Sequence, residues 1–211
     1  MTGRRAASLV AMLLVVATAG SGRAAGTAGS ATAVSHGPRT DRVIALTFDD
    51  GVSPANCRRI LAELVDRRVP ATFFPMAEAL PLDPAFWRLV VEAGDPIGDH
   101  TVTHPHMPHL SYAAQVRQMT SSRATIERTI GRPMLDVFRP PYGEYDGTTL
   151  AAAAAAGFPT VLTWDTTDGD ASPKHAISVM LASAERGRNG SVVLMHCGPN
   201  KTPYLLPDVI A

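Results

Sequence analysis

The chain has 211 residues, of which 45% are hydrophobic, and this composition suits one domain with a substantial core rather than two. Its 19 basic and 19 acidic residues balance, and no long basic run is present. The charge balance therefore argues against a protein that binds nucleic acid.

The N-terminus has the pattern of an export signal. A basic start (MTGRR) precedes a short apolar stretch (AASLVAMLLVVATA), and the ATA ending at Ala19 fits a cleavage site, as does a second ATA ending at Ala33. The apolar stretch is shorter than the ~20 residues that span a bilayer, although an uncleaved anchor or a buried helix remains an alternative. We expect a signal peptide and the start of a linker in 1–33, a linker in 34–41, and a secreted or cell-envelope protein with no membrane span after cleavage.

The rest of the chain, 42–211, alternates between short apolar runs and helical patterns. The apolar runs predict buried strands at 43–48, 71–76, 137–141, 158–164 and 191–196, with a weaker one at 96–100. Helix starts are predicted where an N-cap residue precedes proline, at Ser53, Asp83, Ser172 and Thr202, and two more helices are expected at 111–130 and 146–156.

This alternation predicts parallel strands with helices outside them. No glycine fingerprint for a dinucleotide follows the first run, so a barrel is favoured over a cofactor-binding doubly wound sheet. In such barrels the functional groups lie at the carboxyl ends of the strands. Polar residues close or follow the predicted strands at Asp49, Asp50, His100, Arg139, Asp165 and His196.

A metal site is the first chemistry that these residues suggest. His100 and His104 are four residues apart, and Asp50 is the natural third ligand of a zinc-type site with one position open for water. Gly51 allows a sharp turn after the strand, so that Asp50 can bind the cation while Asp49 takes a proton from its water. A solvated turn is the alternative for these two acids, and His106 and His109 are interpreted as loop or surface residues.

A second set of residues suggests acid catalysis. His196 ends the last predicted strand and could protonate a leaving group, with Asp170 keeping it charged. Arg139 could hold Asp49 through a bidentate pair. The alternatives are a buried histidine bonded to the backbone and a purely structural salt bridge.

Five ordered motifs resemble the NodB-type polysaccharide deacetylases, carbohydrate esterase family 4. They are TFDDG (47–51), HTVTH (100–104), RPPYG (139–143), the looser WDTTDGDASP (164–173) and VLMH (193–196). The resemblance implies a distorted (β/α)7 barrel of the α/β class that removes acetyl groups from a polysaccharide or oligosaccharide with a divalent metal, usually Zn²⁺.

The resemblance also implies a role for each matching residue. Asp50, His100 and His104 would hold the metal, Asp49 would be the base, and His196 would be the acid, tuned by Asp170. Arg139 would position Asp49, the Tyr142 backbone N–H would stabilise the oxyanion, and Tyr142, Trp164 and Leu194 would line the acetyl pocket. Peptidoglycan or chitin-type N-acetylglucosamine is the expected substrate; removal of O-acetyl groups from xylan, or carbohydrate binding without turnover, are the alternatives.

The chain departs from the family pattern at several positions. Asp99 stands where asparagine is more common, Ala171 stands where tryptophan is common, and FFPMAEAL lacks the usual glycine. Only 15 residues follow His196, so we expect the barrel to lack its last strand and to leave an edge exposed. Cys57 and Cys197 could pair in an oxidising compartment, with two unpaired thiols as the alternative.

Overall fold

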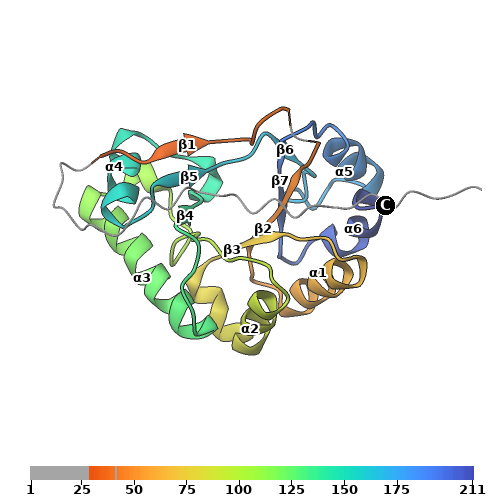
Figure 1. Cartoon of the computed structure of the whole chain (residues 1–211), viewed down its shortest axis with the longest axis horizontal. Coiled ribbons are helices and arrows are strands. Elements are labelled where there is room, and N and C mark those ends of the chain that lie inside the picture. The colour runs from red at the N-terminus through yellow and green to blue at the C-terminus, as the bar shows by residue number, and fades with distance from the viewer. Residues whose placement is uncertain (1–28, 41) are drawn as a thin grey trace, which may run out of the picture.

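The computed structural model describes residues 29–40 and 42–211, in which strands and helices alternate (Figure 1). A signal peptide and the start of a linker were expected in 1–33, and the part of that range up to residue 28 lies outside the described residues. The strands are β1 (Thr32–Val34), β2 (Ala45–Asp50), β3 (Thr72–Pro75), β4 (Val137–Phe138), β5 (Thr160–Leu162), β6 (Thr166–Thr167) and β7 (Val192–His196). The helices are α1 (Pro54–Arg67), α2 (Pro84–Glu92), α3 (Tyr112–Ile130), α4 (Gly147–Ala155), α5 (Ile177–Ala184) and α6 (Thr202–Val209), with 3₁₀ turns η1 (Ala77–Leu82), η2 (Met107–His109) and η3 (Pro141–Gly143).

Two parallel sheets form the centre of the fold. One has the order β3-β2-β7-β6 and the other β1-β5-β4. The segment predicted as a weak strand at 96–100 connects them, because Ile97 pairs with Phe73 of β3 and Asp99 pairs with Phe138 of β4, both as parallel bridges. The strands therefore follow one another around a curved wall with helices outside, which confirms the predicted parallel α/β architecture. Among residues 29–40 and 42–211, no continuous ladder of strand pairing closes this wall into a barrel.

The stretch expected to include a linker is attached to the domain in the described residues 31–40. Thr32–Val34 pairs in register with Thr160–Leu162 of β5. After β1 the chain crosses to the start of β7, where His36 forms an antiparallel bridge with Ser191 (Figure 1). Arg39 then makes an ion pair of 2.6 Å with Asp165. A stretch of alanine and threonine looks like a linker because its side chains bury little, but here its backbone provides the attachment.

β1 also bears on the exposed strand edge that was expected from the sequence. No strand follows α6 in the described residues. The edge of β5 is nevertheless covered, because β1 occupies it. The early residues of the domain thus protect backbone groups that would otherwise lie on an open edge.

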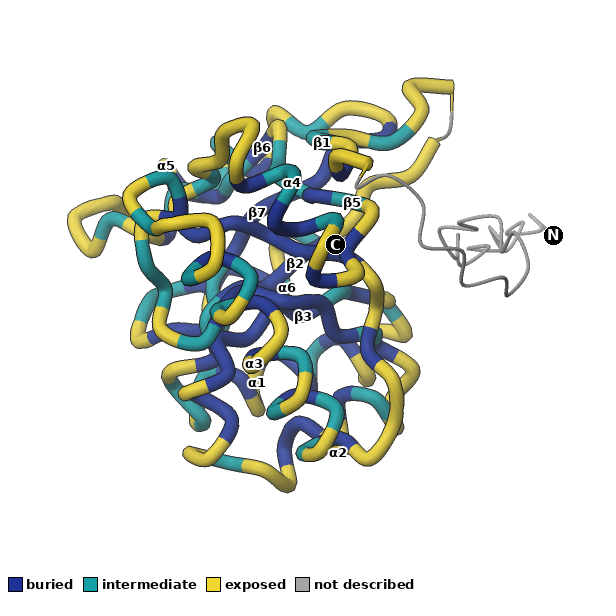
Figure 2. Tube along the Cα trace, turned by 90° about the vertical axis from the view of Figure 1, so that its left-hand side faces the viewer, coloured by how far each residue is buried: buried dark blue, intermediate teal, exposed yellow. Residues whose placement is uncertain are grey.

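The core lies between the strands and the inner faces of the helices. Strands β2, β3 and β7 are buried while the outer faces of the helices are exposed (Figure 2). In α1 the predicted face is buried at Ile60, Leu61 and Leu64, but Val65 is 54% exposed. Within the described part of the chain, no helix combines the length and the apolar character that crossing a membrane requires.

Most predicted helix starts are confirmed, and two differ. α1, α2 and α3 begin directly after Ser53, Asp83 and Ser111. The start predicted at Ser172 is wrong, since residues 168–176 form turns and α5 begins at Ile177. Thr202 was expected as an N-cap, but it is the first residue of α6, and its hydroxyl donates inward to Asp170 instead of accepting from the helix.

The two cysteines are paired. Cys57 of α1 and Cys197, directly after β7, form a disulfide with a Cα–Cα distance of 5.1 Å. Neither described cysteine is free. The bridge ties the helix after β2 to the end of β7, and so connects the two strands that carry Asp49 and His196.

Candidate active site

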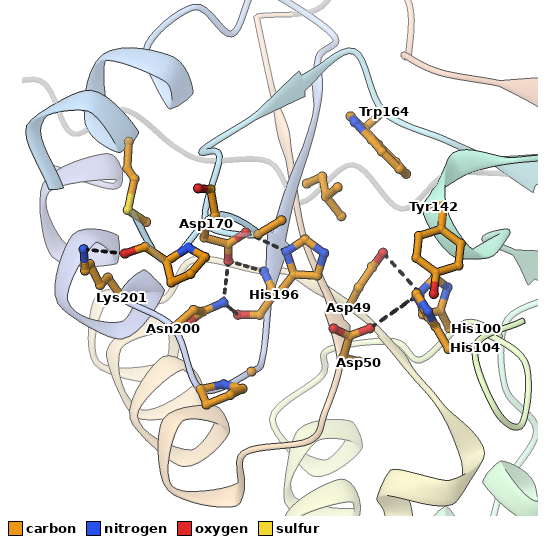
Figure 3. A pocket seen from close by; sticks show the side chains of 17 residues that line it. Asp49, Asp50, His100, His104, Tyr142, Trp164, Asp170, His196, Asn200 and Lys201 are labelled. Carbon is orange, nitrogen blue, oxygen red and sulfur yellow. Dashed lines mark hydrogen bonds and ion pairs between the residues drawn. The ribbon is translucent and has the colours of Figure 1, made fainter. Parts of the chain in front are cut away.

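A cavity of about 720 Å³ opens at the carboxyl ends of the strands. Nine of the ten candidate site residues from the sequence line it: Asp49, Asp50, His100, His104, Tyr142, Trp164, Asp170, Leu194 and His196. Figure 3 labels all of these except Leu194 and shows them around a common space. The tenth, Arg139, is fully buried against Asp49. The residues come from segments far apart in the sequence, and the parallel strands bring them to one end of the fold.

The end of β2 explains how two adjacent carboxylates share this cavity. Side chains of a regular strand alternate between faces, but Asp50 and Gly51 have positive φ values of 73° and 83°, which ends the strand abruptly. A Cβ at Gly51 would lie 2.5 Å from a ring carbon of the buried Trp87, so only glycine fits there without displacement. The turn lets both Asp49 and Asp50 line the same cavity.

Positive φ angles gather around the site. The described residues contain five non-glycine residues with positive φ, and Asp50, Thr101, His104 and Tyr142 are four of them. Such conformations cost free energy and persist where the surrounding structure imposes them, often at functional sites. Here the unusual backbone angles occur at or beside every segment that supplies the candidate metal ligands.

Asp50, His100 and His104 form the one group of potential metal ligands found in the described residues. The Nε2 atoms of His100 and His104 each lie 3.7 Å from Asp50 Oδ1. Ligands at ~2.0–2.2 Å from a tetrahedral zinc ion lie roughly 3.4 Å from one another, so the separation is close to that of a bound site.

Protonation and hydrogen bonding also suit a cation. Nδ1 of His100 lies 2.8 Å from the carbonyl oxygen of Arg139, so the proton belongs on Nδ1 and the lone pair of Nε2 faces the cavity. Burial lowers the pKa of His100 to about 3 and also lowers that of His104, which keeps both rings neutral. Asp50 Oδ1 is buried with no hydrogen-bond partner in the described structure. An unpaired carboxylate oxygen beside two neutral imidazoles fits a divalent metal.

Asp49 is buried beside this group and is held by Arg139. The guanidinium Nη1 donates to Asp49 Oδ1 at 2.7 Å and to the hydroxyl of Thr47 at 2.8 Å. The Arg139 side chain also lies over the ring of Phe74, 4.3 Å from its centroid. Burial raises the pKa of Asp49, against the opposing effect of the Arg139 charge. Asp49 is thus fixed in place with its second oxygen, Oδ2, 3.8 Å from Nε2 of His100.

His196 lies across the cavity and is paired with Asp170. Nδ1 of His196 donates to Asp170 Oδ1 at 2.5 Å. Burial alone would lower the pKa of His196, but the hydrogen bond and charge of Asp170, together with the charges of Asp49 and Asp50, raise it to about 9. The imidazole is therefore charged at neutral pH and can donate a proton.

The remaining candidates form the walls of the cavity. Trp164, Tyr142 and Leu194 line it, and Tyr142 is 53% exposed at the rim. His106 stacks on the Tyr142 ring at 4.1 Å and bonds to Glu144 at 2.8 Å. His106 thus lies in an exposed loop, as interpreted from the sequence, but it contacts a wall residue.

The structure shows whether the residues that depart from the family pattern line the cavity. Asp99 is buried and its Oδ1 accepts from the Thr101 N–H at 2.8 Å; it does not line the cavity. Ala171 does line it, so a small side chain stands at that wall. Asp165 follows β5 but pairs with Arg39 outside the cavity.

Sequence reasoning missed three polar supports of the site. Thr47 accepts from Arg139, and Asn200 and Thr202 both donate to Asp170 Oδ2. Thr47 is two residues before Asp49, so strand alternation could have placed it on the same face. No pattern in the sequence distinguishes Asn200, because it lies in the turn that returns the chain from β7 to α6.

Comparison with known proteins places this geometry in a family. The family model described as polysaccharide deacetylase matches residues 36–161. The chain is 29% identical over 164 residues to a peptidoglycan-N-acetylglucosamine deacetylase of Bacillus cereus, covering 77% of this chain and 76% of the relative. It is 31% identical over 153 residues to a chitooligosaccharide deacetylase of Sinorhizobium fredii, covering 72% and 71%.

Among solved structures, a similar fold is that of a family 4 carbohydrate esterase pseudoenzyme from Bacillus anthracis, with a TM-score of 0.79 and 25% identity. The match covers 86% of this chain and 63% of that chain, so the present chain spans less than two thirds of it. A mutant of that pseudoenzyme with restored enzymatic activity gives the same TM-score at 27% identity. The family match, the relatives and the fold agree, and the chain belongs to the NodB-type polysaccharide deacetylases, carbohydrate esterase family 4, a family of hydrolytic enzymes.

Proposed function

We propose that the chain is a metal-dependent hydrolase that removes acetyl groups from N-acetylated polysaccharide of the peptidoglycan or chitin type. The observation that carries this proposal is the arrangement around one cavity. The Asp50–His100–His104 group and Asp49 lie on one side, and the His196–Asp170 pair lies on the other. The substrates named for the Bacillus cereus and Sinorhizobium fredii relatives support the choice of glycan.

Asp50, His100 and His104 would hold a divalent cation, which we assign as Zn²⁺ because one carboxylate and two neutral imidazoles are the donors of a three-ligand zinc site. When bound, the cation would lower the pKa of a water molecule and polarise the acetyl carbonyl. Asp49 accepts the proton of the attacking water, and its raised pKa brings its basicity closer to neutral pH. Arg139 keeps the carboxylate of Asp49 oriented toward the cavity.

The residues on the opposite side of the cavity protonate the leaving group. Amide cleavage requires a proton on the departing nitrogen, and His196, charged at neutral pH, supplies it. The backbone N–H of Tyr142 helps to bind the oxyanion, and Trp164 and Leu194 exclude water from the acetyl group. The proton taken by Asp49 and the one given by His196 move on opposite sides of the scissile bond.

The test is acetate release by the zinc-loaded protein from chitooligosaccharides. Asp49→Asn should reduce kcat by about 10²–10⁴, the usual contribution of a general base, while zinc binding measured by calorimetry persists. Asp165→Asn is a matched control, because it also removes a carboxylate from an arginine pair but outside the cavity, and it should retain acetate release.

Three other outcomes have different meanings. Release from acetylated xylan but not from chitooligosaccharides would favour an O-acetyl esterase. Zinc and glycan binding without acetate release from any acetylated glycan would favour a carbohydrate-binding homologue. Equal activity of Asp49→Asn and the unmodified protein would refute the assigned base.

A further inference from the structure

The carboxylate behind His196 is held by an unusual number of donors. Asp170 accepts Nδ1 of His196 on Oδ1, and its Oδ2 accepts the His196 backbone N–H and Asn200 Nδ2, each at 2.7 Å (Figure 3). Oδ2 also accepts the hydroxyl of Thr202 at the start of α6. These bonds favour the ionised carboxylate, and although burial alone would raise the pKa of Asp170, the bonds from His196 and Thr202 lower it.

A second carboxyl group adjoins this network. Asp168 is completely buried and makes no ion pair with a basic side chain among the described residues. Its Oδ1 accepts the Asp170 N–H at 3.0 Å, and its Oδ2 lies 3.3 Å from the hydroxyl oxygen of Thr202. The single backbone donor offsets only part of the cost of burying a negative charge, and the hydrogen of the Thr202 hydroxyl is already in use.

Hydrogen counting decides the protonation of this group. A threonine hydroxyl carries one hydrogen and can accept another. Its hydrogen goes to Asp170 Oδ2, which is the closer and charged acceptor. The contact between Thr202 and Asp168 then needs a hydrogen from Asp168. An ionised Asp168 would instead place two buried carboxylates around one hydroxyl, which is costly.

We propose that Asp168 is a neutral carboxylic acid that donates to Thr202, and that Asp168 and Thr202 are positioning residues that fix the Asp170 carboxylate against His196. The inference rests on the proposed role of His196 as the acid and deepens it. In this arrangement Asp168 donates a hydrogen bond to the Thr202 oxygen, and the Thr202 hydroxyl donates one to Asp170.

The charges around Asp168 also favour its neutral form. Burial and the charge of Asp170 raise the pKa of Asp168 to about 8. The charged or titratable groups that face His196 are Asp170 and Asp168 from the loop after β6, Asp49 and Asp50 from β2, and His104. With Asp168 neutral, the loop after β6 contributes the single charge of Asp170 to the imidazolium.

The first test compares two substitutions of one residue. Thr202→Val keeps the shape of the side chain but removes the hydroxyl, and Thr202→Ser keeps the hydroxyl. The readout is the pKa of His196, from NMR titration of the imidazole resonances of the zinc-loaded protein. We expect Thr202→Val to lower this pKa by about one unit, the scale of one hydrogen bond to a charged group. Thr202→Ser should remain close to the unmodified protein, and identical pKa values in all three proteins would overturn the proposal.

The second test asks whether Asp168 carries a proton. In Asp168→Asn the amide oxygen can accept the Asp170 N–H, and the amide nitrogen can donate to Thr202, as the neutral acid does. The readout is the ¹³C resonance of the Asp168 side-chain carboxyl, titrated in the unmodified protein and identified by its loss in Asp168→Asn. It should have the chemical shift of a neutral acid at pH 7, below the Asp168 pKa of about 8. A carboxylate chemical shift at pH 7 would contradict the proposal.

These titrations are independent of turnover. If the expected shifts occur but no acetylated glycan is hydrolysed, the positioning role stands and the proposed function fails. If acetate is released and the alkaline limb of kcat moves with the His196 pKa in Thr202→Val, both are supported. Activity with an unchanged His196 pKa in Thr202→Val would refute the positioning role alone.

Discussion

Replacing Gly51 with alanine tests how the end of β2 is built. Gly51 has a φ of +83°, and a Cβ there would lie 2.5 Å and 2.8 Å from two ring carbons of Trp87. Trp87 is only 1% exposed, so its ring cannot move into solvent. Gly131, which ends α3 with a φ of +73°, is the matched control, because a Cβ there meets no atom within 4 Å.

The two substitutions separate two costs. Both place alanine in the left-handed region, which costs about 1–2 kcal/mol. Only Gly51→Ala also forces a buried ring to shift, and overpacking of this kind costs typically about 1–3 kcal/mol. We therefore expect Gly51→Ala to lower the free energy of unfolding by about 2–5 kcal/mol and Gly131→Ala by about 1–2 kcal/mol.

Urea denaturation of the two variants measures the difference, and calorimetry with zinc gives a second readout. Because Gly51 follows Asp50 directly, Gly51→Ala should weaken zinc binding roughly tenfold or more, as loss of support around a ligand usually does, while Gly131→Ala should not. Equal destabilisation by the two variants would refute the steric argument. Unchanged zinc affinity in a folded Gly51→Ala protein would show that the turn does not orient Asp50.

Three other predictions concern the rest of the fold and the acid. Reducing the Cys57–Cys197 bridge should lower the free energy of unfolding by about 3–5 kcal/mol, because it joins residues 140 apart; coincident urea curves with and without reductant would contradict this. A chain starting at residue 38 should be less stable than one starting at residue 29 by about 3 kcal/mol or more, since it loses the backbone bonds of β1; equal midpoints would refute this. Acetate release should fall as the pH rises through about 9, where His196 loses its proton, and a flat rate up to pH 10 would count against the assigned acid.

The raised pKa of His196 also has a consequence for stability. A folded-state pKa of about 9, above the ordinary value of 6.5, means that the folded protein holds this proton more tightly than the unfolded chain does. The resulting stabilisation is complete below pH 6.5 and is lost as the pH rises through about 9. Urea denaturation across this range provides the measurement, and His196→Gln should remove this part of the pH dependence.

The candidate site was predictable because its residues end predicted strands. Asp49, Asp50 and His196 close apolar runs, and parallel strands bring their carboxyl ends to one edge. The glycine after the two acids indicated a sharp turn, and the φ values of Asp50 and Gly51 confirm it. The sequence could not indicate that Gly51 is also required by contact with Trp87, because that contact depends on how α2 packs.

The elements that were missed are short or atypical in composition. β1 and β6 contain three and two residues, too few for a hydrophobic period to appear. The sequence of β1, TAV, lies in a stretch of small residues that resembles a linker. Thr202 precedes a proline and looks like an N-cap, but packing of α6 against the loop after β6 turns its hydroxyl toward Asp170. Local patterns cannot predict such long-range contacts.

The position of β1 has a consequence for how this domain is assembled. Thr32 pairs with Thr160, a contact that spans 128 residues of sequence (160 − 32). Contacts of such large sequence separation slow folding. Processing after Ala33 would remove two of the three paired residues and leave a groove along β5 with backbone groups unmatched. Such a groove would accept an extended peptide, including the same segment of a neighbouring molecule, and swapped dimers are the expected product.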